Sequence, residues 1–159
     1  HRSLERWVHL EMNQRQPDQA APIKALLGAF VASAVAFSLL DLLWLGVVAR
    51  GFYDTHMGPL KADPINGLAA ALFYVMFISL ILIYGIYRAS SPKDALRRGA
   101  ELGFATYATY ELTNWAVIQD WPGVLVLPDI LWGVVLTGCT AWAGRRVFER
   151  LHPAPPANT

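Results

Sequence analysis

The chain has 159 residues, of which 55% are hydrophobic and 16% are charged, and its mean hydropathy is +0.34. Soluble domains carry about 25% charged residues, so this composition argues against a water-soluble globule. The formal net charge of +1, with no long run of Lys or Arg, excludes a nucleic-acid partner. The single cysteine, Cys139, has no disulfide or metal-ligand companion, and the sequence predicts neither a metal site nor a cofactor.

Residues 1–22 form a polar leader before the first apolar window. That window begins too far into the chain, and is too long, for a cleavable signal peptide, so we expect the first span to be retained. Within the leader, Leu4, Trp7 and Val8 fall at helical spacing. An amphipathic helix on the membrane surface and a disordered tail fit this segment equally well.

Four apolar windows follow, at residues 25–49, 64–87, 102–119 and 121–144, and together they contain three charged residues. A helix needs about 20 apolar residues to cross a membrane, and the third window reaches this length when it is extended by a turn toward Arg98. We therefore predict spanning helices at about 23–49, 65–88, 93–119 and 122–148. Ser91 or a neighbour should cap the third helix, with Pro92 in its first turn.

The predicted fold class is all-α, an integral membrane four-helix bundle with short loops. Residues 23–150 form one domain, and residues 151–159, rich in Pro and Ala, form a disordered tail. Lys and Arg number eleven on the side that holds the N-terminus, the middle loop and the C-terminus, against two on the other side. Because these residues collect on the cytoplasmic side, we expect an inner-membrane protein with both termini cytoplasmic.

The three charged residues inside the windows are all acids: Asp41, Glu111 and Asp129. With a rise of about 1.5 Å per residue, they lie about 6, 2 and 5 Å to the outer side of their window centres. Three helices therefore place carboxyl groups in one thin layer. An ionisable residue inside a span indicates function, so these three acids are the candidate catalytic residues. No Lys, Arg or His lies within the windows, and at least one acid should be protonated through desolvation and like-charge coupling.

Residues at helical spacing from the acids should share their interior faces. The predicted ligand-binding residues are Trp44, Tyr107, Tyr110, Asn114 and Trp132. Leu45 lies on the same predicted face as Asp41, and the second helix offers Asn66 and Tyr74 as polar partners. Trp115 and Trp121 fit a belt at the membrane interface, whereas Gly138, Cys139 and Gly144 fit close helix packing.

The segments Asp41-Leu-Leu-Trp44 and Asp129-Ile-Leu-Trp132 resemble each other. Either two helices meet the same local requirement or the similarity arose by chance. Pro128 should bend the fourth helix. Alternatively, residues 121–127 form a partly re-entrant segment and the regular helix begins at Pro128.

Three functions fit the acids. The leading hypothesis is a pocket for a small apolar or lipid ligand, in which a carboxyl could act as general acid or base on a lipid. The second is a proton- or cation-coupled transport or channel component, and the third is a structural or accessory subunit. The expected partners are membrane lipid, an apolar small molecule and, for the transport hypothesis above all, a second copy of the chain.

Three motifs in order resemble an uncharacterised bacterial family, catalogued as domain of unknown function 2177. They are the stretch from Leu40 to Tyr53, the stretch from Tyr107 to Asn114, and Asp129-Ile-Leu-Trp132-Gly133. Where the family often has Tyr-Asp-Leu-Thr-Asn, this chain has Glu at position 111. The resemblance spans about residues 23–148 and implies a multi-pass bacterial membrane protein without an established activity. Some members of the family are encoded near fatty-acid-modifying genes, which hints at lipid chemistry.

Overall fold

The computed structural model describes residues 21–60 and 64–153, and these ranges contain helices and no strand. Helix α2 (Ala21–Leu43) continues into the π-helical segment η1 (Trp44–Val48), and α4 (Gly67–Leu80) continues into the π-helical segment η3 (Ile81–Tyr87). The two longest helices are α5 (Pro92–Val117) and α6 (Gly123–Leu151). The expected surface helix near Trp7 and most of the expected tail lie outside the described residues.

Three helical segments are long and apolar enough to cross a membrane: Ile23–Val48, Gly67–Tyr87 and Gly123–Leu151. The all-helical fold is therefore confirmed, together with the character of a membrane protein. Helix α5 has 26 residues but does not belong to this set. Its first turns carry Lys93, Asp94, Arg97, Arg98 and Glu101, so its apolar part is shorter than that of the other three.

The connection between the first two spans differs from the prediction. The predicted helices at about 23–49 and 65–88 leave a loop between them, but Arg50–Met57 forms helix α3, followed by the short 3₁₀ helix η2 (Gly58–Leu60). Tyr53 and Met57 are half-buried, and Met57 packs against a small apolar cluster with Trp121, Val126 and Ile130. An amphipathic segment that covers apolar surface in this way gains stability as a helix, which explains the difference.

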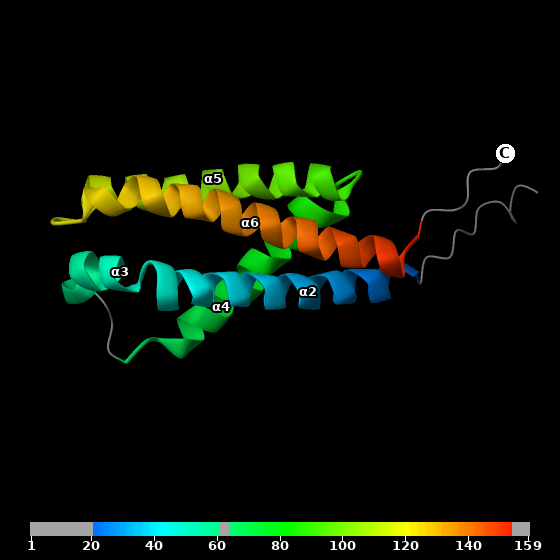
Figure 1. Ribbon diagram of the computed structural model, residues 1–159, viewed down its shortest axis with the longest axis horizontal. Coiled ribbons are helices and arrows are strands. Elements are labelled where there is room, and N and C mark those ends of the chain that lie inside the picture. The colour runs from blue at the N-terminus through cyan, green and yellow to red at the C-terminus, as the bar shows by residue number, and fades with distance from the viewer. Residues whose placement is uncertain (1–20, 61–63, 154–159) are drawn as a thin grey trace, which may run out of the picture.

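The helices pack around one main core. Helices α5 and α6 lie side by side along their lengths, α2 runs along α6, and α4 crosses the others at a steep angle (Figure 1). Phe37 of α2, Ile81 of η3 and Leu136 of α6 are almost completely buried in this core. The outward faces of α2 and α4 remain apolar and exposed, with Leu39 at 65% and Leu72 at 62% exposure, as expected for surfaces that face lipid.

Glycines allow α5 and α6 to approach closely. A Cβ atom on Gly99 would lie 2.6 Å from the carbonyl oxygen of Thr137, and one on Gly103 would lie 2.8 Å from the carbonyl carbon of Gly133. Gly138 faces Leu96 in the same manner, at 3.1 Å from its carbonyl oxygen. Small residues at a membrane-helix interface let the backbones pack by van der Waals contact, so the prediction of close packing at Gly138 is confirmed.

The ends of α5 and α6 follow from local chemistry. Ser91 caps α5 and accepts a hydrogen bond from the Asp94 amide at 3.2 Å, and Pro92 occupies the first turn, as predicted. Helix α6 starts at Gly123 and runs through Pro128, so the alternative in which the regular helix begins at Pro128 is wrong. Burial of Leu125 and Val126 in the first turns stabilises the helix before the proline.

Candidate functional site

Asp129 on α6 lies at the centre of the acid layer. The hydroxyl of Tyr53, on α3, donates a hydrogen bond to Asp129 Oδ1. Asp129 also interacts electrostatically with Asp41 of α2 and with Glu111 of α5. The three acids are therefore neighbours, in agreement with the single depth that the sequence gives them.

Asp41 interacts with side chains of two other helices. The hydroxyl of Tyr74, on α4, donates to Asp41 Oδ2 at 3.1 Å, and the indole of Trp132 also interacts with this carboxylate. Tyr74 thus meets the prediction for a polar residue of the second helix. Asn66 does not, because its side chain caps α4 by accepting a hydrogen bond from the Ala69 amide at 3.0 Å.

Glu111 is the most deeply buried of the three acids, with 3% exposure. The indole nitrogen of Trp121 donates to Glu111 Oε2 at 3.1 Å. The Glu111 carboxyl also interacts with that of Asp129, so two acids of different helices are neighbours in this layer. Trp121 itself is only 8% exposed, so its assignment to an interfacial belt is wrong: it serves as the donor to a buried acid.

The two similar segments meet through their tryptophans. The rings of Trp44 and Trp132 stack with centroids 4.5 Å apart and planes 7° from parallel. Both indole nitrogens are buried, and neither has a hydrogen-bond partner of ordinary geometry among the described residues. Leu45, placed by the sequence on the same interior face, is 44% exposed, because η1 is π-helical and changes the register of its face after Trp44.

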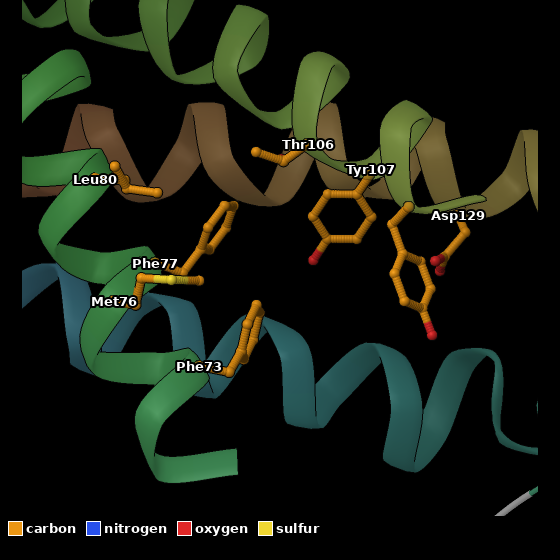
Figure 2. A pocket seen from close by; sticks show the side chains of 8 residues that line it. Phe73, Met76, Phe77, Leu80, Thr106, Tyr107 and Asp129 are labelled. Atoms are coloured by element: carbon orange, nitrogen blue, oxygen red, sulfur yellow. The ribbon is translucent and has the colours of Figure 1, made fainter. Parts of the chain in front are cut away.

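An apolar cavity of about 270 Å³ lies between α4 and α5 and reaches α6. It is lined by Phe73, Met76, Phe77, Leu80, Thr106, Tyr107, Tyr110 and Asp129. Figure 2 shows the α4 side chains at one end and the Asp129 carboxylate at the other, with Tyr107 between them. The volume is just below the usual range of ligand pockets, about 300–1,000 Å³.

The cavity includes only part of the predicted site. Tyr107, Tyr110 and Asp129 line it, whereas Asp41, Glu111, Trp44, Trp132 and Asn114 do not. Asp41 and Glu111 are turned toward Tyr74 and Trp121 instead, and the Asn114 side chain interacts with Tyr110. The picture of one pocket lined by all three carboxyls is therefore corrected, since Asp129 alone of the three faces the cavity.

Several residues of this site were not predicted from the sequence. Tyr53 was part of the first family motif, and its contact with Asp129 depends on the unexpected helix α3. The α4 lining of Phe73, Met76, Phe77 and Leu80 lies in a uniformly apolar window without a charge to mark a face. Only the crossing angle of α4 decides which of these side chains meet α5.

Among the described residues, the acids of the site have no basic partner. No Lys, Arg or His side chain in residues 21–60 and 64–153 forms an ion pair or hydrogen bond with Asp41, Glu111 or Asp129. Burial, and next the hydrogen bond to Asp129, raises the pKa of Tyr53, so this phenol remains a hydrogen-bond donor. Within the same residues, no group of three His, Cys, Asp or Glu is placed to hold a metal ion.

Apolar spans around an internal acid layer define the class as a multi-helix membrane protein. Residues 26–146 match the family described as "Predicted membrane protein (DUF2177)". The chain belongs to this family, as its motifs indicated. No curated protein and no solved structure shows a significant match to the chain.

Proposed function

We propose that the chain is a four-span inner-membrane protein that holds an apolar or lipid chain in the cavity between α4, α5 and α6. The observation that carries the proposal is the cavity itself, which is apolar along α4 and ends at the Asp129 carboxylate. A pocket of this kind suits an amphiphile, whose chain contacts the apolar walls and whose polar end meets the few polar groups.

The fourth span is helix α5. It lies antiparallel to α6 along its length (Figure 1), so a bilayer that α6 crosses also surrounds α5. Its charged first turns lie at the end of the bundle where Arg145 and Arg146 of α6 are found, because Gly99 faces Thr137 and Ala141. These charges then sit at the membrane surface, and the excess of Lys and Arg on that side favours cytoplasmic termini.

Topology can be tested by cysteine labelling in a Cys139→Ala background. With an impermeant maleimide applied from outside, Ile65→Cys should react, since Ile65 is 80% exposed beside the outer end of α4. Lys93→Cys, at the start of α5, should react only after the membrane is opened. The reverse pattern would reverse the orientation, and outside labelling of both positions would remove the fourth span.

The function can be tested by filling the cavity. Leu80→Trp places a large side chain in the cavity, whereas Leu72→Trp makes the same change on the same helix at a position that is 62% exposed and outside the cavity lining. Molecules that copurify with each variant are extracted and measured by mass spectrometry. A chain-bearing molecule should copurify with the wild type and Leu72→Trp and be lost from Leu80→Trp; equal recovery from both variants would refute the proposal.

A second candidate function is proton-coupled transport. The specific observation in its favour is the interaction between Glu111 and Asp129, because neighbouring carboxyl groups inside a membrane are suited to pass a proton between them. A pH-dependent flux in reconstituted vesicles that Glu111→Gln abolishes would support this candidate. An unchanged flux in Glu111→Gln would reject it.

A further inference from the structure

We propose that the ligand of this cavity is a cationic amphiphile, a molecule with an alkylammonium group that binds at Asp129 and an apolar chain that lies along α4. The inference rests on the proposed function and adds the charge of the ligand's polar end. Three observations support it: the charge around the cavity's polar end, the rings that line the cavity, and the remaining capacity of Asp129 to accept hydrogen bonds.

The charge around the polar end is acidic only. Asp129 lines the cavity, Asp41 and Glu111 interact with Asp129, and no basic side chain among the described residues pairs with any of them. An unpaired carboxylate in a low-dielectric site is costly, and a cation beside it recovers much of that cost. A carboxylate or phosphate group at the same place would be repelled.

The aromatic lining favours a cation as well. Four of the side chains around the cavity carry rings: Phe73, Phe77, Tyr107 and Tyr110. The face of an aromatic ring attracts an ammonium group, most strongly where water is excluded. Phe73 and Phe77 lie at the α4 end of the cavity and would contact the apolar chain, whereas the Tyr107 ring lies between that end and Asp129 (Figure 2) and is the ring placed to contact the cation.

Asp129 also has hydrogen-bonding capacity left. Tyr53 donates to Oδ1 and Glu111 interacts with the same carboxylate; an ionised carboxylate offers about four lone-pair sites, so sites remain for a further donor. A primary ammonium group carries three N–H donors, and its hydrogen bond to a carboxylate is roughly twice as strong as a neutral one. The hydroxyl of Tyr107 lies in the wall between Asp129 and the α4 side chains (Figure 2), where it can accept a further N–H.

The test uses the full chain in nanodiscs of a zwitterionic lipid, and it compares octylamine, octan-1-ol and octanoic acid as labelled probes. Binding is the amount retained by protein-containing discs above that retained by empty discs, which removes partition into lipid. At neutral pH octylamine is protonated and octanoic acid is ionised. Wild-type protein should bind octylamine about tenfold or more tightly than octan-1-ol, and should not bind octanoate.

Two amide variants give a matched comparison. Asp129→Asn keeps the shape of the side chain and removes its charge, so it should weaken octylamine binding by about tenfold or more and weaken octan-1-ol binding much less. Asp120→Asn makes the same change in the exposed turn before α6, where φ is 61°, a conformation that Asn tolerates. It should bind all three probes as the wild type does.

The outcomes separate the inference from the proposed function. Equal affinity of wild type for octylamine and octan-1-ol, or tighter binding of octanoate, overturns the cationic ligand and leaves an apolar pocket in place. Binding of none of the three probes overturns both. Because the wild-type ranking alone decides the sign of the charge, the test holds even when Asp129→Asn does not fold.

Discussion

Trp44 and Trp132 stack face to face, with ring centroids 4.5 Å apart, and each follows an intramembrane aspartate by three residues in its own helix. The contact joins the C-terminal end of the first span to the last one. Trp132 also interacts with Asp41, the acid of the opposite helix. The two Asp-x-x-Trp segments therefore contact each other in the fold, as the interpretation of a shared local requirement predicts.

The stack should contribute measurably to stability. We expect Trp132→Leu to lower the free energy of unfolding, and a double-mutant cycle with Trp44→Leu to give a coupling energy of about 0.5–1.5 kcal/mol. The measurement is unfolding in mixed detergent micelles. Trp115→Leu serves as the control partner, because Trp115 is 56% exposed, and its effect should simply add to that of Trp44→Leu. A coupling near zero for the stacked pair would contradict the assignment.

Two substitutions of Glu111 test whether stability depends on its charge or only on its hydrogen-bond acceptor. Glu111→Gln keeps an oxygen for the Trp121 indole and removes a charge beside Asp129, so its stability should equal or exceed that of the wild type. Glu111→Ala leaves the buried indole N–H without a partner and should cost about 1–3 kcal/mol. Glu101→Ala, at a side chain that is 61% exposed, should change stability by less than about 0.5 kcal/mol. Equal losses for Gln and Ala at position 111 would mean that the charge itself is required.

Asp94 should make stability depend on pH at the end of the bundle where α5 begins. The Ser90 backbone N–H, followed by Arg98, lowers the pKa of Asp94. Because the folded pKa lies below the unfolded value of about 3.9, this stabilisation is complete above that pH and is lost as the pH falls toward the folded pKa. The unfolding midpoint of Asp94→Asn should therefore lie below that of the wild type at neutral pH, and the difference should shrink below about pH 4. A difference that stays constant down to the lowest pH would contradict the linkage.

Gly103 tests the close packing of α5 against α6. Gly103→Ala brings a methyl group into the backbone of Gly133 and should cost about 1–3 kcal/mol, as overpacking usually does. Gly46→Ala is the control, because a Cβ atom there meets no atom within 4 Å, and it should be neutral or slightly stabilising. If both variants unfold at the same detergent concentration as the wild type, the helices are not held as closely as described.

The long helices and the grouping of the acids could be predicted from the sequence because both depend on local quantities. Apolar windows locate helices, and a constant rise per residue gives depth, so Asp41, Glu111 and Asp129 could be placed together without a structure. The capping by Ser91 follows from its own chemistry and that of Pro92. Each of these features needs only a short stretch of chain.

The partners of the acids could not be predicted in the same way. Tyr53 reaches Asp129 because α3 packs against the end of the bundle where α6 begins. The Trp121 side chain is buried against Glu111 and does not lie at the membrane interface. The cavity depends on the steep crossing of α4, which a uniformly apolar segment does not encode. These contacts join residues that are distant in sequence or lie in a turn, and they are set by packing.

The most direct measurement of the central claim, that the cavity holds a chain-bearing ligand, is photo-crosslinking in living cells. A benzophenone amino acid replaces Phe77, which lines the cavity and is 3% exposed, or Val75, which is 59% exposed on the same helix and lies outside the cavity lining. After irradiation, mass spectrometry of the intact protein should show one discrete adduct from position 77 and the mixed adducts of bulk phospholipids from position 75. The same bulk-lipid pattern at both positions, or no adduct at position 77, would contradict the claim.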